Sequence, residues 1–212
     1  MKTILCYGDS NTWGYIPGLA GRYKYHQLWP NIFQAKLSKE VQVITEALNG
    51  RTTVLDEPER EGRNGKTMLL PLIESHMPLD LIIIMLGTND LKAIYNRTPE
   101  DVAKGVLTLV KIIRKYHNVT FSAQPEILII SPPHVTQLSP LMAMQFESAS
   151  EKSKQLAVHL QKVAVKNCCL FLDAASIVIP SNKDGVHIDA DSHLKLAELV
   201  YSLINSKLSQ LS

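Results

Sequence analysis

The sequence predicts one three-layer α/β/α domain built on a five-stranded parallel sheet. Five short runs of apolar and β-branched residues are continuous rather than alternating, which is typical of strands buried on both faces of a parallel sheet. Helical patterns separate the runs, and this alternation implies right-handed crossovers with helices on both faces of the sheet. The chain of 212 residues can bury roughly 70% of its unfolded surface and shows no repeat or linker. The expected strands are Thr3–Tyr7, Val41–Thr45, Leu81–Leu86, Ile127–Ile130 and Cys169–Leu172.

The first two expected helices are short, and each contains a proline. They lie near Trp29–Leu37 and Thr67–Glu74, with Pro30 and Pro71 inside these ranges. Because proline lacks an N–H and fixes φ, each should start or kink its helix.

The later helices have clearer starts and a periodic apolar face. The first begins after Thr98 as N-cap, with Pro99 at the first helical position and Glu100 and Asp101 in the first turn. Its apolar residues keep a period of about 3.6, as do those of the next helix and of the helix that closes the chain. These positions are Val102, Val106, Leu109, Val110 and Ile113, then Leu156, Leu160, Val163 and Ala164, then Ala197, Val200, Tyr201, Ile204 and Leu208.

Composition and charge exclude several classes of protein. The chain is 45% hydrophobic and 20% charged, unlike a disordered chain or a coiled coil. Its net charge of +2 indicates no nucleic-acid partner. No run approaches the roughly 20 apolar residues that span a bilayer, and the first apolar run is too short for a signal peptide, so no membrane partner is expected. The three cysteines, Cys6, Cys168 and Cys169, favour a reducing compartment over a disulfide framework, and the expected location is cytoplasmic.

Polar residues follow the expected strands at the sheet edge where ligands of such folds bind. Ser10 follows the first strand in Gly-Asp-Ser-Asn-Thr-Trp-Gly, and Gly50 follows the second. Asn89 follows the third in Gly-Thr-Asn-Asp, and Asp184 and His187 precede the closing helix in Asp-Gly-Val-His. Each block alone has a structural explanation as a turn, a helix cap or an exposed histidine. Their shared position at one edge of one sheet favours chemistry.

These residue types suit nucleophilic attack on an ester. A serine hydroxyl needs a base to remove its proton, histidine can accept that proton, and a carboxylate on the other ring nitrogen fixes the tautomer. Asp184 and His187 are three residues apart, so one turn can bring both side chains to the same side. The N–H groups of Ser10 and Gly50, with the amide of Asn89, can donate to the oxygen that becomes negative. Neither a Gly-x-Gly-x-x-Gly nor a Walker loop is present, and no cofactor is expected.

The four blocks resemble those of the SGNH (GDSL-type) hydrolases over nearly the whole chain. They are most similar to the bacterial arylesterase/acyltransferase subgroup through Gly-Asp-Ser-x-Thr-Trp-Gly, Arg-Thr-Thr, Gly-Thr-Asn-Asp and Asp-Gly-Val-His. The resemblance implies a flavodoxin-like architecture and homo-oligomers. It also implies a nucleophile at Ser10, oxyanion-hole residues at Ser10, Gly50 and Asn89, and the catalytic pair Asp184 and His187.

Residues beside the expected nucleophile are candidates for the substrate pocket. Asn11 stands where the family pattern has leucine, which leaves substrate preference open. Trp13 begins a stretch to Trp29 that holds both tryptophans and three tyrosines. Packing against the sheet and walling of the pocket both explain this stretch. The loop from Pro132 to Phe146 is rich in apolar residues, which favours a lid or a subunit contact.

The segment from Asp184 to His193 holds three aspartates and two histidines, so a metal site has to be weighed. Asp191 or Ser192 is well placed as N-cap of the closing helix, which removes one potential ligand. No metal is therefore expected.

The sequence predicts a serine esterase that hydrolyses short acyl groups of carboxylic esters, and can transfer them, through an acyl-enzyme intermediate. Its expected partners are a small-molecule ester and further copies of the chain. Two alternatives stay open: a carbohydrate O-acetylesterase with the same catalytic residues, and a flavodoxin-like binding module without chemistry. A metal-dependent hydrolase would differ from these through its inhibition by chelators.

Overall fold

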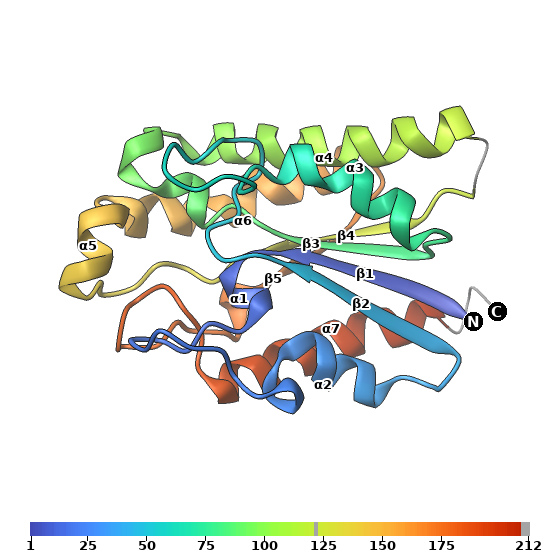
Figure 1. Cartoon of the computed structure of the whole chain (residues 1–212), viewed down its shortest axis with the longest axis horizontal. Coiled ribbons are helices and arrows are strands. Elements are labelled where there is room, and N and C mark those ends of the chain that lie inside the picture. The colour runs from blue at the N-terminus through green and yellow to red at the C-terminus, as the bar shows by residue number, and fades with distance from the viewer. Residues whose placement is uncertain (121–122, 209–212) are drawn as a thin grey trace.

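The computed structural model describes residues 1–120 and 123–208, and its centre is one parallel sheet (Figure 1). The strand order is β2-β1-β3-β4-β5, which confirms the predicted fold class. Because the chain passes from β1 to β2 on one side and then to β3 on the other, the strand order reverses beside the carboxyl end of β1. Ligands of such sheets bind at this point. The strands are β1 (Lys2–Gly8), β2 (Val41–Ala47), β3 (Leu81–Met85), β4 (Glu126–Ser131) and β5 (Leu170–Asp173).

Helices cover both faces of the sheet (Figure 1). Three helices, α3, α4 and α6, lie on one face, and α2 and α7 lie on the other. Two shorter helices, α1 and α5, lie near the carboxyl ends of the strands. The helices are α1 (Ser10–Trp13), α2 (Trp29–Lys36), α3 (Gly65–His76), α4 (Pro99–Thr120), α5 (Pro140–Phe146), α6 (Ala149–Lys166) and α7 (Ala190–Leu208). None of the described helices combines the length and hydropathy that crossing a membrane requires.

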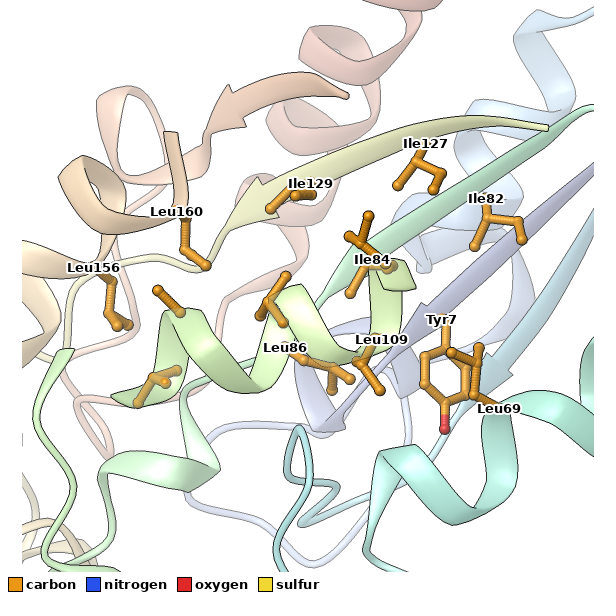
Figure 2. Close-up of a cluster of buried hydrophobic side chains, with 14 of the residues drawn as sticks. Tyr7, Leu69, Ile82, Ile84, Leu86, Leu109, Ile127, Ile129, Leu156 and Leu160 are labelled. Atoms are coloured by element: carbon orange, nitrogen blue, oxygen red, sulfur yellow. The ribbon is translucent and has the colours of Figure 1, made fainter. Parts of the chain in front are cut away.

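Two apolar clusters fill the space between the sheet and its helices. Successive residues of a strand point to opposite faces, so Ile82 and Ile84 belong to one cluster and Ile83 to the other. Figure 2 shows the first cluster, in which Leu109 of α4 and Leu160 of α6 pack on the sheet. Each fully buried side chain of this size stabilises the fold by about 1.5–3 kcal/mol.

The expectation of strands buried on both faces holds for the three central strands only. Apart from the first residues of β1 and β4, every residue of β1, β3 and β4 is buried. β2 and β5 are edge strands, and their residues are mostly half-buried. An edge strand has a neighbour on one side only, so the apolar run alone does not decide how far it is covered.

The start of α4 confirms the capping prediction. The Oγ1 of Thr98 accepts a hydrogen bond from the N–H of Asp101 at 3.2 Å, and Asp101 Oδ2 accepts one from the N–H of Thr98 at 3.1 Å. This reciprocal pair satisfies two backbone donors that a helix start leaves free.

The closing helix differs from its prediction. Because α7 begins at Ala190, Asp191 and Ser192 lie in its first turn and neither of them is its N-cap. Of the expected apolar face of α7, Ala197, Val200 and Ile204 are buried, Tyr201 is half-buried, and the side chain of Leu208 lies outside the described residues.

The prolines of the two early helices take different positions. Pro30 lies in the first turn of α2, and Pro71 lies inside α3.

Candidate active site

The turn after β1 presents Ser10 at the carboxyl edge of the sheet. Asp9 caps α1, because its Oδ1 accepts a hydrogen bond from the N–H of Asn11 at 3.0 Å. Gly14 ends the helix with a φ of 93°, a left-handed conformation that glycine adopts without steric cost. Ser10 is therefore the first residue of a single, firmly held helical turn.

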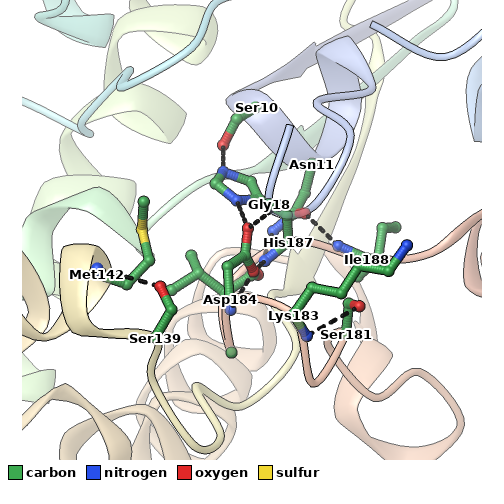
Figure 3. Close-up of polar contacts among 12 residues, drawn as sticks. Ser10, Asn11, Gly18, Ser139, Met142, Ser181, Lys183, Asp184, His187 and Ile188 are labelled. Carbon is green, nitrogen blue, oxygen red and sulfur yellow. Dashed lines mark hydrogen bonds and ion pairs between the residues drawn. The ribbon is translucent and has the colours of Figure 1, made fainter. Parts of the chain in front are cut away.

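A chain of hydrogen bonds runs from Ser10 through His187 to Asp184 (Figure 3). His187 Nε2 lies 3.0 Å from Ser10 Oγ, and His187 Nδ1 lies 2.7 Å from Asp184 Oδ2. Because a carboxylate only accepts, Nδ1 carries the ring proton and Nε2 is left to accept from the serine hydroxyl. The arrangement can remove a proton from Ser10.

The carboxylate of Asp184 accepts hydrogen bonds from several backbone N–H groups. Its Oδ1 accepts from the N–H groups of Val186 at 3.0 Å and His187 at 2.9 Å, and its Oδ2 also accepts from the N–H of Gly18 at 3.3 Å. Burial opposes the negative charge, but the hydrogen bonds from His187 and Val186 outweigh it and lower the pKa of Asp184. Asp184 is thus ionised at neutral pH, beside His187 as the spacing predicts.

A cavity of about 140 Å³ lies in front of Ser10. Gly50, in the turn after β2, borders it with a φ of 82°. This left-handed conformation favours glycine, and a Cβ here would displace the guanidinium of Arg60. Of the residues predicted for catalysis, Ser10, Gly50, Asn89 and His187 line this cavity, and Asp184 hydrogen-bonds His187.

The side-chain amide of Asn89 points toward the turn that carries Ser10. Its Nδ2 donates to the carbonyl oxygen of Arg51 at 3.1 Å and lies 3.4 Å from Asp9 Oδ2. The second distance is long for a hydrogen bond, and Asn89 also lines the cavity in front of Ser10.

Asp90 ties the loop after β3 to the loop after β2. Its Oδ2 accepts a hydrogen bond from the N–H of Thr53 at 3.0 Å, and its Oδ1 accepts one from the Thr53 hydroxyl. The loops that carry Gly50 and Asn89 are thereby joined. Burial raises the pKa of Asp90 to about 7 and that of Asp9 to about 6, so both carboxyls titrate near neutral pH.

Tyr15, not Trp13, is the aromatic residue at the reacting groups. The ring of Tyr15 lies 4.3 Å from that of His187, with 34° between the planes, and it lines the cavity. Trp13 does not line the cavity, and its ring is covered by the guanidinium of Arg22 at 4.9 Å. The aromatic stretch after Ser10 thus contributes Tyr15 to the cavity, and the assignment of Trp13 to the substrate pocket stays a prediction.

The side chain of Asn11 bonds to the loop that carries His187. Its amide bonds to the carbonyl oxygen of Val186 at 3.2 Å and to the N–H of Ile188 at 3.1 Å, on either side of His187. Asn11 is not among the residues that line this cavity, and its assignment to the substrate pocket stays a prediction.

A charged cluster at the mouth of the cavity is missing from the sequence prediction. Arg60 and Lys92 both line the cavity, and both bind Glu57, at 2.8 Å and 2.9 Å. They also line an adjoining groove of about 590 Å³. The one sequence feature that could have indicated this cluster is that Lys92 lies three residues after Asn89.

The apolar loop from Pro132 to Phe146 contributes to the site through α5. Met142 and Phe146 line the cavity, whereas Leu141 and Met144 are exposed at 61% and 81%. One face of α5 therefore walls the site, and the other presents apolar side chains to its surroundings.

In the segment from Asp184 to His193, which was weighed as a metal site, the Asp184, His187 and His193 side chains bond to other protein groups. Asp184 and His187 bond to each other, and His193 is buried with its Nδ1 accepting from the N–H of Trp29 at 3.2 Å. Burial lowers the pKa of His193 to about 4, which keeps it neutral. Within the described ranges, no group of three or more His, Cys, Asp or Glu side chains is placed to hold a metal ion.

The chain matches a family of known proteins over most of its length. Residues 6–198 match the GDSL-like lipase/acylhydrolase family. No curated protein matches the chain.

Several solved structures are similar to this chain along their whole length. A carbohydrate acetylesterase family member from Sinorhizobium meliloti is 37% identical, with 99% of this chain and 100% of that chain covered and a TM-score of 0.94. Est24, a carbohydrate acetylesterase from the same organism, is 34% identical, with 97% and 99% covered and a TM-score of 0.91. The aryl esterase of M. smegmatis gives the same identity, coverage and TM-score as Est24.

Proposed function

Because the chain belongs to the GDSL-like lipase/acylhydrolase family, we propose that it removes short acyl groups from carboxylic esters through an acyl-enzyme on Ser10. The chain is an ester hydrolase of the SGNH type. One observation carries the assignment of the residues, namely the hydrogen-bond chain Ser10 Oγ–His187 Nε2 and His187 Nδ1–Asp184 Oδ2.

In the first half of the reaction, Ser10 Oγ attacks the ester carbonyl carbon while its proton passes to His187 Nε2. The bond from the carbonyl carbon to the alcohol oxygen then breaks, and His187 returns the proton to that oxygen. Water repeats the sequence on the acyl-serine and releases the carboxylic acid. Asp184 stays ionised and offsets the positive charge on His187.

Three donors support the negative oxygen of each tetrahedral intermediate in this proposal. They are the N–H groups of Ser10 and Gly50 and the Nδ2 amide of Asn89, from the loops after β1, β2 and β3. The Asp90–Thr53 contact favours a fixed spacing between the last two loops. Donors held before the reaction need little reorganisation when charge develops.

The size of the cavity leads to a prediction for acyl length. A cavity of about 150 Å³ is enough for a benzene-sized group, and the space in front of Ser10 is about 140 Å³. We expect kcat/KM for aryl acetate and butyrate to exceed that for octanoate by about tenfold or more, a loss of at least ~1.4 kcal/mol for the longest chain. Initial rates with the three aryl esters measure this, and equal rates for all three would contradict it.

The same acyl-enzyme is proposed to pass its acyl group to small alcohols. Apolar side chains from Tyr15, Met142 and Phe146 border the cavity, and apolar walls hold less ordered water beside His187. With an aryl acetate and increasing 1-propanol, propyl acetate should form faster than uncatalysed exchange allows. Phe146→Ala should shift the products toward acetate, whereas Leu141→Ala, on the exposed side of α5, should not. Free acid as the dominant product at every propanol concentration would mean a plain hydrolase.

A carbohydrate O-acetylesterase is the second candidate. Two of the similar structures are described as carbohydrate acetylesterases, and the adjoining groove of about 590 Å³ is lined by Glu57, Glu59, Arg60 and Gln145. These polar side chains suit a hydroxyl-rich alcohol. Higher kcat/KM for acetylated sugars than for aryl acetates would favour this candidate. A binding module without chemistry would neither hydrolyse esters nor react with a fluorophosphonate.

The remaining proposals concern assembly and location. We propose a homo-oligomer, because Leu141, Met144 and Ile94 expose large apolar side chains near the mouth of the site. A cytoplasmic location is proposed from the cysteine content alone, with Cys6 in the core and Cys168 exposed.

A further inference from the structure

The side chain of Asn11 joins the turn that carries Ser10 to the loop that carries His187 (Figure 3). Its Oδ1 accepts a hydrogen bond from the N–H of Ile188 at 3.1 Å, and its Nδ2 donates to the carbonyl oxygen of Val186 at 3.2 Å. The sequence separations are 177 and 175 residues, so both bonds are long-range. Asn11 is buried, and water does not readily replace these bonds.

The backbone around His187 is held on two sides. On one side, the N–H of His187 donates to Asp184 Oδ1 at 2.9 Å, and its carbonyl oxygen accepts from the N–H of Ser181 at 2.8 Å. On the other side, Asn11 pairs with the C=O of the preceding residue and the N–H of the following one. One side chain thus holds the backbone groups immediately before and after His187. A carboxamide fits them because it offers a donor and an acceptor side by side.

We propose that Asn11 is a positioning residue that sets the place of His187 relative to Ser10 and does not contact the substrate. Asn11 follows Ser10 directly, and its own N–H is held by Asp9 Oδ1 at 3.0 Å. One residue, fixed at its backbone and at its side chain, therefore links the nucleophile to its base. Leucine, which the family pattern has here, can form neither side-chain bond. The proposal rests on the proposed function, because it requires Ser10 and His187 to react together.

The first test is Asn11→Leu, which removes both bonds at a similar side-chain size. A misplacement of about 1 Å can cost roughly 100-fold in rate, so we expect kcat for an aryl acetate to fall by about 10–100-fold. KM should change by less than about threefold, because the lost bonds act on proton transfer and not on substrate binding. The rate at which a fluorophosphonate labels Ser10 should fall together with kcat, since both need His187 as base.

Thr12→Val is the matched control. Thr12 is the next residue of α1 and is fully buried, and its hydroxyl has no hydrogen-bond partner among the described residues. Valine has the same shape, so kcat and the labelling rate should stay at the wild-type level.

Asn11→Asp is the second variant: it keeps the acceptor for Ile188 but sets a carboxylate oxygen against the carbonyl of Val186. Its kcat should fall as well, and circular dichroism checks that each variant is folded.

Wild-type kcat and a wild-type labelling rate in folded Asn11→Leu would overturn the proposal. If Asn11→Leu does not fold, the same two measurements on Asn11→Asp decide, and wild-type values there would overturn the proposal. A changed ratio of kcat/KM between acetate and butyrate esters, with unchanged labelling, would also overturn it, because Asn11 would then act on the substrate. The proposed function fails separately, if the wild-type enzyme is not labelled on Ser10.

Discussion

Replacing Ser10 by alanine is expected to lower kcat by about 10⁴-fold or more while the protein stays folded. The variant lacks the atom that forms the acyl-enzyme, so only binding and the oxyanion donors still act on the ester. The fold should tolerate the change, because α1 is capped by Asp9 and the Oγ of Ser10 contacts His187 at 3.0 Å rather than a core residue. Steady-state hydrolysis of an aryl acetate measures kcat.

Covalent labelling locates the nucleophile independently of activity. After treatment with a fluorophosphonate, mass spectrometry should place the adduct on Ser10 and find none in Ser10→Ala. Ser131→Ala is the matched control, since Ser131 is also buried at the carboxyl end of a strand but its hydroxyl has no partner among the described residues. This control should keep both activity and labelling. An adduct elsewhere, or substantial activity in Ser10→Ala, would refute the assignment.

Asp184→Asn should have an effect of similar size, about 10⁴-fold in kcat. The carboxylate accepts the Nδ1 proton of His187 at 2.7 Å, which leaves Nε2 free to take the proton of Ser10. An asparagine amide that donates to Nδ1 stabilises the opposite tautomer, in which Nε2 carries the proton and cannot act as base. The negative charge that stabilises protonated His187 is lost as well.

The loss in Asp184→Asn should appear in kcat, with KM little changed, and thermal unfolding should show a folded protein. The asparagine oxygen can still accept from the N–H groups of Val186 and His187, and only the longer bond from the N–H of Gly18 is lost, so the loop should keep its shape. Asp191→Asn is the control, because it removes one carboxylate from an exposed position in the first turn of α7. Its activity should be unchanged. Near wild-type kcat in Asp184→Asn would mean that His187 needs no carboxylate partner.

Much of the site could be read from the sequence because a parallel sheet gathers the carboxyl ends of its strands. The apolar runs predict β1, β2 and β3, and whatever follows each of them lies at the same edge. Ser10, Gly50 and Asn89 are neighbours because β1, which precedes Ser10, lies between β2 and β3. Asp184 and His187 were close to each other from their spacing, but their approach to Ser10 depends on the path of the loop before α7.

Side-chain direction around the nucleophile was decided only by the tertiary structure. In one helical turn, successive residues point about 100° apart. Asn11 therefore faces the His187 loop, and Trp13 faces Arg22. Tyr15 lies beyond the turn and reaches the imidazole. Sequence order places all three beside Ser10 and does not state which of them meets the cavity.

The sequence by itself determined the fold class and predicted Ser10, Asp184 and His187 as the catalytic residues, because both rest on local patterns. Periodicity sets strands and helices, and a parallel sheet converts their order into one functional edge. The tertiary structure alone decided which partners complete the site. Arg60 and Lys92 meet at Glu57, and Asn11 reaches the loop of His187. The contacts of Lys92 with Glu57 and of Asn11 with the His187 loop join segments far apart in the chain. Their geometry depends on how the helices pack on the sheet, which no local pattern encodes.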